Sequence, residues 1–244
     1  MAQHAVLEVF LTFCRVGACL MMAPGFASDR VPMRIRLGIA LVCAFVISPV
    51  AGRGDAPIAP YHMALTIGLE LGVGGLIGLQ ARLFIAALET LLTAAAMSIG
   101  LGNAMTASVE AAEHVSPLAA IGSLAASVCV FVSDAHLELL RGLAASYDII
   151  PRGGVLPTGG ALSQLVDACA RTFFLALRLA SPFLVYGVVA NLAAGLINRF
   201  AAQAPFYFIS APLILLGGLA LAALTMKNGL VVYIAELAAW AAQG

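Results

Sequence analysis

The feature that most constrains the fold is a mostly apolar stretch of 40 residues, Met63–Gly102. As a single α-helix it would be about 60 Å long, whereas the hydrocarbon core of a bilayer is only about 30 Å thick. A soluble domain could not cover so much apolar surface, because 62% of the 244 residues are hydrophobic and only 10% are charged. The stretch therefore predicts a membrane protein, with two helices or one broken helix here and Gln80 and Arg82 at the break.

Other apolar stretches are too short or too long for one bilayer crossing. Leu37–Val50 would be about 21 Å long as a helix, and Ala161–Ala194 is over-long. Ser181–Pro182 should kink or break the longer stretch, because proline removes one backbone donor. We predict about seven hydrophobic helices of uneven length, the others being Ala5–Pro24, Leu118–Val132, Phe206–Thr225 and Val231–Trp240, with a turn at Lys227–Gly229.

One further helix is predicted to be amphipathic rather than spanning. In Ser133–Gly154, leucines recur at helical spacing with Glu138 and Arg141 between them, and Pro151 and Gly153 should end the helix. The predicted fold class is all-α: a polytopic integral membrane protein built of helical hairpins with broken and short helices. We expect a single membrane-embedded domain over residues 1–244.

Several charges lie inside the apolar stretches. Glu8 and Arg15 are seven residues apart and so share one helix face, which indicates either a structural pair inside a bundle or a pore or relay role. Glu70 and Glu89 are further carboxylates in a setting where ionisable groups are costly.

Asp167, Arg171 and Arg178 form one stripe of a later helix. The stripe is either an internal ion-pair network or a hydrophilic lining. The candidates for an intramembrane charge network are Glu8, Arg15, Glu70, Arg82, Glu89, Asp167, Arg171 and Arg178.

Small residues and basic residues predict packing and orientation. Glycines 68, 72, 75 and 78 form a ridge that favours close helix contact. The loop Gly25–Arg36 carries three arginines against one aspartate, which favours the cytoplasmic side and leaves the N-terminus outside. Ser28 or Asp29 is expected to cap a helix that begins near Pro32.

The segment Gly100–Pro117 is one of the few polar intervals of the chain. Glu110, Glu113 and His114 have the order E-x-x-E-H, but no second cluster completes a metal site in the sequence. Gly100 and Gly102 permit backbone bends that larger residues resist. We interpret the segment as a mobile loop between two sets of hairpins.

Motifs of catalysis are missing from the sequence. It has no P-loop pattern, no H-E-x-x-H and no nucleophile-elbow spacing. Five cysteines lie in apolar stretches without a C-x-x-C pair and are expected to be small buried hydrophobes. The net charge of zero gives no basis for nucleic-acid binding. We therefore expect no catalytic residue, no cofactor and no metal.

Four stretches together resemble the FliR family of flagellar export-gate proteins. The first holds F-L-T-F-C-R-V-G-A, M-A-P-G-F and V-P-M-R-I-R, within Phe10–Arg36, and the second is the short helix that ends at Ser48–Pro49. The third is D-A-H-L-E-L-L-R-G-L-A-A-S-Y-D-I-I-P, Asp134–Pro151. The fourth is N-L-A-A-G-L-I-N-R-F-A-A-Q, Asn191–Gln203, followed by F-Y-F-I-S-A-P. The chain departs from the family at Ala202, where proline is usual, and in lacking an Asp-Pro pair in the central segment.

Within the family, the chain is most similar to the flagellar branch. The resemblance implies a passive, non-enzymatic subunit of a type III secretion channel. Such a subunit joins FliP-like and FliQ-like subunits in a helical, pore-forming assembly and works beside FlhB-like and FlhA-like components. The cargo would be unfolded flagellar proteins. The subunit would be located in the flagellar basal body, in the bacterial inner membrane. By the same resemblance the central segment is a plug in the closed pore, with the candidate residues Gly100, Gly102, Asn103, Met105, Glu110, Glu113 and His114.

The alternative hypothesis is a proton- or ion-coupled secondary transporter of small solutes. Membrane carboxylates such as Glu70, Glu89 and Asp167 and broken helices would suit one. No clear repeat relates the two halves of the chain, which counts against it. A membrane enzyme, a third class, would need a nucleophile or metal cluster that the sequence lacks.

Overall fold

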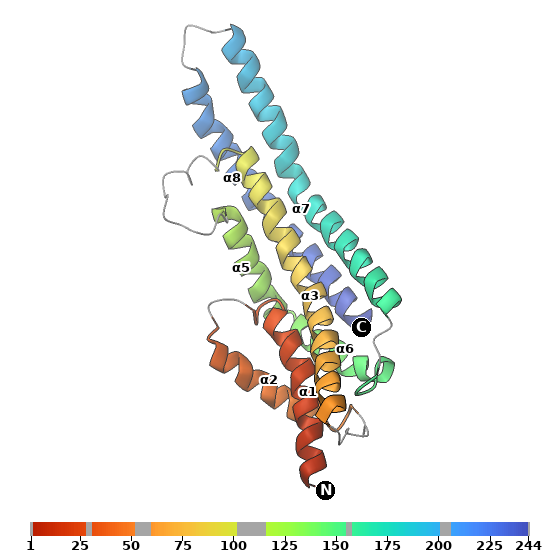
Figure 1. The fold of residues 1–244 in the computed structure, drawn as a ribbon. Coiled ribbons are helices and arrows are strands. Elements are labelled where there is room, and N and C mark those ends of the chain that lie inside the picture. The colour runs from red at the N-terminus through yellow and green to blue at the C-terminus, as the bar shows by residue number, and fades with distance from the viewer. Residues whose placement is uncertain are drawn as a thin grey trace. The chain divides into compact units, whose positions relative to one another are not determined.

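A computed structural model of the chain describes residues 2–27, 31–51, 60–101, 116–154, 158–200 and 206–243. Those residues hold seven α-helices and no strand (Figure 1). The predicted all-α fold class is therefore confirmed. The helices are α1 (Ala2–Met22), α2 (Met33–Ile47), α3 (Pro60–Ser98), α5 (Pro117–Val132), α6 (Ala135–Ile149), α7 (Thr158–Phe200) and α8 (Phe206–Gln243).

Helix α3 is continuous over 39 residues, so the predicted break at Gln80 and Arg82 is wrong. The prediction assumed that a helix must fit the thickness of a bilayer. Nothing forces a helix to stop there when its backbone hydrogen bonds are satisfied internally. Around the expected break, Ala81 is buried and Arg82 is exposed. The helix can therefore continue here without burying the charged side chain of Arg82.

Helix α7 is also continuous, over 43 residues, and contains Pro182. Proline at this position removes the N–H that would donate to the carbonyl of Arg178. The neighbouring hydroxyl of Ser181 donates to that carbonyl at 2.9 Å instead. The lost acceptor is therefore satisfied. Of the predicted kink or break at Ser181–Pro182, the break is wrong, and the kink stays a prediction.

Helix α8 runs through the expected turn at Lys227–Gly229 and is 38 residues long. The turn prediction is therefore wrong. A Cβ at Gly229 would lie 3.2 Å from the Leu179 side chain, so the glycine marks a close helix contact. Glycine in a helix interior costs about 1 kcal/mol relative to alanine, and packing of this kind can offset that cost.

The ends of the short helices agree better with the predictions from the sequence. Helix α2 begins at Met33 directly after Pro32, and Ser28 and Asp29 lie outside the described residues. Helices α5 and α6 meet at a bend of 70°, where Asp134 adopts a left-handed conformation with φ 58°. The predicted end of the amphipathic helix is confirmed, because α6 stops at Ile149 and Gly153 takes φ 73° in the turn that follows.

Four of the described helices are long and apolar enough to cross a membrane: α1, α3, α7 and α8. The bent pair α5–α6 would make a fifth span if it crosses as one unit. Together with the all-α fold, these helices are those of a polytopic integral membrane protein.

The chain divides into two compact contact units, which we describe separately. The first, unit 1, comprises Met1–Leu83, Ser127–Ala170 and Ile234–Gly244, and the second, unit 2, comprises Phe84–Ala126 and Arg171–Tyr233. Helices α3, α5, α7 and α8 each contribute residues to both units.

Unit 1 packs α1 against α3 at glycines. A Cβ at Gly74 would overlap the carbonyl oxygen of Arg15, and one at Gly78 would lie 2.7 Å from the carbonyl oxygen of Cys19. Gly74 and Gly78 are four residues apart, the spacing of a close-contact motif. The predicted ridge is therefore only partly right: Gly78 belongs to it, whereas positions 68, 72 and 75 have no neighbouring atom within 4 Å of a built Cβ.

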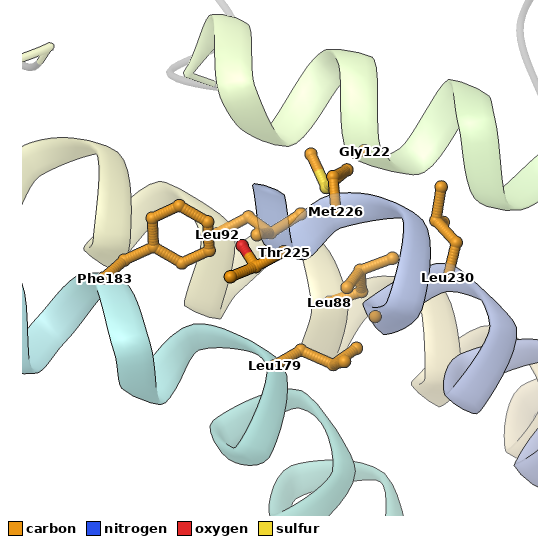
Figure 2. Close-up of a pocket in the computed structure, with 9 residues that line it drawn as sticks. Leu88, Leu92, Gly122, Leu179, Phe183, Thr225, Met226 and Leu230 are labelled. Atoms are coloured by element: carbon orange, nitrogen blue, oxygen red, sulfur yellow. The ribbon is translucent and has the colours of Figure 1, made fainter. Parts of the chain in front are cut away.

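Unit 2 has an apolar core that includes Ile99, Ala180 and Phe183. Four helices of this unit surround a pocket of about 20 Å³, close to the space of one water molecule. Figure 2 shows Leu88, Gly122, Leu179 and Met226 among the residues around it. The pocket is lined almost entirely by apolar groups, and its one hydroxyl, that of Thr225, donates to the Leu221 carbonyl.

Candidate functional site

The candidate site is a cluster of charged and polar side chains inside unit 1, built around Arg15 of α1 and Glu70 of α3. Both side chains are only 1% exposed. The Nε of Arg15 donates to one carboxylate oxygen of Glu70 at 2.7 Å, and Nη2 donates to the other at 3.2 Å. This bidentate arrangement uses the planar fork of the guanidinium and fixes the relative orientation of the two helices.

The contact at Gly74 explains how the pair forms. Gly74 lies one helical turn after Glu70, on the same face of α3, and touches the backbone of Arg15 itself. The missing side chain at Gly74 lets the two backbones approach, and the approach brings Glu70 within reach of the guanidinium.

Helix α6 and the turn that follows it supply the remaining partners of Arg15. Nη1 donates to the hydroxyl of Ser146 at 3.1 Å, and Nη2 donates to the carbonyl of Ile150 at 3.0 Å. The guanidinium carbon lies 3.8 Å from the ring centre of the buried Tyr147, a cation–π geometry. The carboxylate, two α6 groups and one backbone carbonyl of the following turn therefore surround the cation.

A second arginine, Arg152, joins the cluster from the turn after α6. Its Nη2 donates to the carbonyl of Ser48 at 2.8 Å and to the hydroxyl of Thr12 at 3.1 Å. Its Nη1 lies 3.7 Å from a carboxylate oxygen of Glu8. Arg152 thus links α1 to the end of α2, with its side chain only 3% exposed.

The cluster balances its own charges. Two arginines face two glutamates, and the backbone N–H of Gly153 donates to Glu70 at 3.3 Å. Glu70 thus accepts three hydrogen bonds, two of them from the Arg15 guanidinium. The carboxylate is therefore arranged to hold α1, α3 and the turn after α6 together.

The predicted charge candidates separate into two groups. Glu8, Arg15 and Glu70 lie in the cluster, but the expected pair of Glu8 with Arg15 is wrong, because each has a different partner. The seven-residue spacing places both on one face of α1. There Arg15 pairs with Glu70 of α3, and Glu8 pairs with Arg152 of the turn after α6. Of the others, Glu89 is half-buried, and Arg82, Asp167, Arg171 and Arg178 are exposed.

Five side chains of the cluster were not singled out from the sequence: Thr12, Ser48, Ser146, Tyr147 and Arg152. A signal for the first four was present, because they lie within the stretches that resemble the FliR family. Arg152 directly follows the third stretch. The family motifs thus coincide with groups that meet in space.

The central polar segment is described only at its ends. Gly100 adopts φ 89°, its N–H donates to the Met97 carbonyl, and the N–H of Leu101 donates to the Ala96 carbonyl. These two bonds and the left-handed glycine form a Schellman cap that ends α3. The candidates Gly102, Asn103, Met105, Glu110, Glu113 and His114 lie outside the described residues. Within the residues that can be searched, no three His, Cys, Asp or Glu side chains are grouped for a metal ion.

The fold and the cluster define the class: an all-α integral membrane protein whose N-terminal helices are joined through a buried, charge-balanced cluster. Residues 6–239 match the family described as bacterial export proteins, family 1. The chain belongs to this family, the FliR family.

Relatives of the chain in several bacteria are named flagellar biosynthetic protein FliR. The flagellar biosynthetic protein FliR of Caulobacter vibrioides is 30% identical over 220 residues, which cover 89% of this chain and 88% of the relative. FliR of Escherichia coli is 29% identical over 89% of this chain and 83% of its own length. FliR of Aquifex aeolicus is 24% identical, with 93% and 91% covered.

Proposed function

We propose that the chain is a non-enzymatic core subunit of the flagellar type III protein export channel in the bacterial inner membrane. The observation that carries the proposal is the family match over residues 6–239, together with relatives named as flagellar biosynthetic proteins. The buried cluster supports it, because the most deeply buried charges serve to join helices. The apolar pocket of unit 2 offers little to a polar solute.

The proposed partners are FliP-like and FliQ-like subunits, with FlhB-like and FlhA-like components beside them and unfolded flagellar proteins as cargo. Long apolar faces support the need for partners. Only 28% of the most apolar part of α7 and 11% of that of α8 is buried within the chain. Phe174, Val188 and Leu224 are each more than two-thirds exposed, so lipid or neighbouring helices must cover them.

The test is deletion of the gene followed by complementation. Cells without the chain should fail to secrete flagellar proteins and to swim, and the wild-type gene should restore both. An affinity-tagged chain should co-purify with the FliP-like and FliQ-like subunits. Wild-type secretion in the deletion strain would refute the proposal.

The central segment is proposed as a plug of the closed pore, on the strength of the chain's resemblance to the FliR family. Replacement of Gly102 by phenylalanine, or deletion within Asn103–Ser116, should alter gating. The measurement is ion leak across the membrane of growing cells together with motility. A wild-type leak and wild-type motility in these variants would count against a plug.

The N-terminus is proposed to lie in the periplasm, because Gly25–Arg36 is the most basic short loop. An epitope placed before residue 1 should be accessible to an impermeant reagent in spheroplasts. Accessibility only after lysis would reverse the orientation. A control epitope on a known cytoplasmic protein reports lysis.

A further inference from the structure

The polar side chain of Asn191, in α7, reaches the C-terminal end of α3 within unit 2. Its Nδ2 donates to the carbonyl of Ser98 at 2.9 Å and to the carbonyl of Gly187 at 2.7 Å. Ser98 is the last residue of α3. The contact therefore joins α7 to the point at which α3 ends.

The Schellman cap explains why Ser98 needs this donor. The last carbonyls of a helix have no partner within the helix. In α3, the cap satisfies those of Ala96 and Met97 through the N–H groups of Leu101 and Gly100. The Ser98 carbonyl takes no part in the cap, and the amide of Asn191 supplies its donor.

Glycines bring the helices close enough for this bond. A Cβ at Gly187 would lie 2.7 Å from the Cβ of Ser98, and a Cβ at Gly218 of α8 would lie 2.8 Å from that of Ile99. Gly187 and Asn191 are one turn apart and share a face of α7. Helix α7 thus contacts the last residue of α3, and α8 contacts the residue directly after it.

We propose that Asn191 is a positioning residue that fixes where α3 ends and in which direction the chain leaves it at Gly100. The proposal deepens the proposed export function, because the central polar segment begins directly after this cap. The geometry needs a donor, since both contacted atoms are carbonyl oxygens. Aspartate has the size of asparagine but offers only acceptors when ionised, so it would repel both carbonyls.

The first experiment measures hydrogen exchange in the purified export complex. In Asn191→Asp and Asn191→Leu, the amides of Gly100 and Leu101 should exchange about tenfold faster than in the wild type, the factor that corresponds to one net hydrogen bond. The amide of Ile150, which donates to Ser146 at the end of α6, should keep its rate. Gln164→Leu, another exposed amide of α7, is the matched control and should change neither.

Two results would overturn the positioning role. One is unchanged exchange at Gly100 and Leu101 in Asn191→Asp. The other is equal acceleration at Ile150, because that would indicate general loss of structure rather than a local effect. This measurement needs no export activity, so its outcome is separate from that of the gene deletion above.

The second experiment connects the cap to export. Asn191→Asp should lower secretion of flagellar proteins severalfold while the complex is recovered in normal yield, and Gln164→Leu should secrete normally. Wild-type secretion by Asn191→Asp with accelerated exchange would refute a role of this position in export. Loss of secretion in the control as well would contradict the specific role of Asn191.

Discussion

The two contact units join their helices by different chemistry. In unit 1, α1 meets α3 at Gly74, next to the buried Arg15–Glu70 pair, and a second, partly buried pair joins Arg152 to Glu8. In unit 2, glycines again allow close contact, and two neutral hydrogen bonds join the helices: Asn191 donates to Ser98, and the hydroxyl of Tyr186 donates to the Ile214 carbonyl at 2.9 Å.

The difference sets the cost of deforming each unit. Separating Arg15 from Glu70 would leave a charge in a low-dielectric interior, which is far more costly than losing a neutral hydrogen bond. Unit 1 is therefore expected to keep one arrangement, and unit 2 to be the easier of the two to adjust. The following variants test that contrast, from the largest expected effect to the smallest.

Replacing Arg15 by methionine should have the largest effect, because it leaves the Glu70 carboxylate buried and unpaired. Such losses cost about 3–5 kcal/mol, enough to abolish recovery of the assembled complex. The measurement is complex yield and apparent Tm by fluorescence-detected size-exclusion chromatography.

The matched control removes both charges. The double variant Arg15→Met/Glu70→Leu should recover much of the yield, because an apolar pair of similar volume replaces a buried ion pair at little cost. A double variant as poor as the single one would show that the pair does more than balance charge.

Replacing Gly74 by alanine should come next, because the new Cβ would overlap the backbone carbonyl of Arg15. Overpacking of this kind costs about 1–3 kcal/mol, and a shifted helix would also strain the Arg15–Glu70 pair. The control is Gly72→Ala on the same helix, where no atom lies within 4 Å and the change should be neutral or stabilising by up to about 1 kcal/mol. Equal Tm values for the two variants would remove the proposed role of the close contact.

Replacing Gly187 by alanine should cost less than the change at Gly74, about 1–2 kcal/mol. The new Cβ would again meet backbone and side-chain atoms, those of Ser98, but no charge pair depends on the contact. Gly195→Ala in α7 is the control, since it has open space around it. A loss at Gly187 as large as that of Arg15→Met would overturn the ranking of the two units.

The smallest effect is expected at the surface of α6. Arg141 pairs with Glu138 one turn earlier, and the two side chains are 71% and 34% exposed. Exposed pairs of this kind contribute about 0–0.5 kcal/mol, so Arg141→Ala should leave the Tm and the yield unchanged. A shift comparable to that of Gly74→Ala would mean that a partner subunit covers this pair.

The sequence predicted local features of the fold better than helix lengths. Apolar stretches and the signals at Pro32 and Gly153 located α2 and the end of α6, because such signals act within a few residues. The breaks expected at Arg82, Ser181–Pro182 and Lys227–Gly229 failed for physical reasons: an exposed charge, a hydroxyl that replaces a lost donor, and a glycine used for packing.

The site was predictable in part. The cost of a charge in an apolar segment was enough to single out Glu8, Arg15 and Glu70. Their pairing was not, since the partner of Arg15 lies 55 residues away and depends on which helices pack together. Arg152 lies in a turn. Arginine is common in turns, so its presence there does not indicate a buried charge. The plug candidates other than Gly100 lie beyond the described residues and stay predictions.

The charge balance of the cluster has an electrical consequence. Moving one elementary charge across a membrane changes its electrical energy by about 2.3 kcal/mol for each 100 mV of membrane potential. Arg15, Glu70, Arg152 and Glu8 sum to zero and are held at contact distances. If unit 1 moves as one body, its cluster transports no gating charge, and a change of membrane voltage exerts no net force on it.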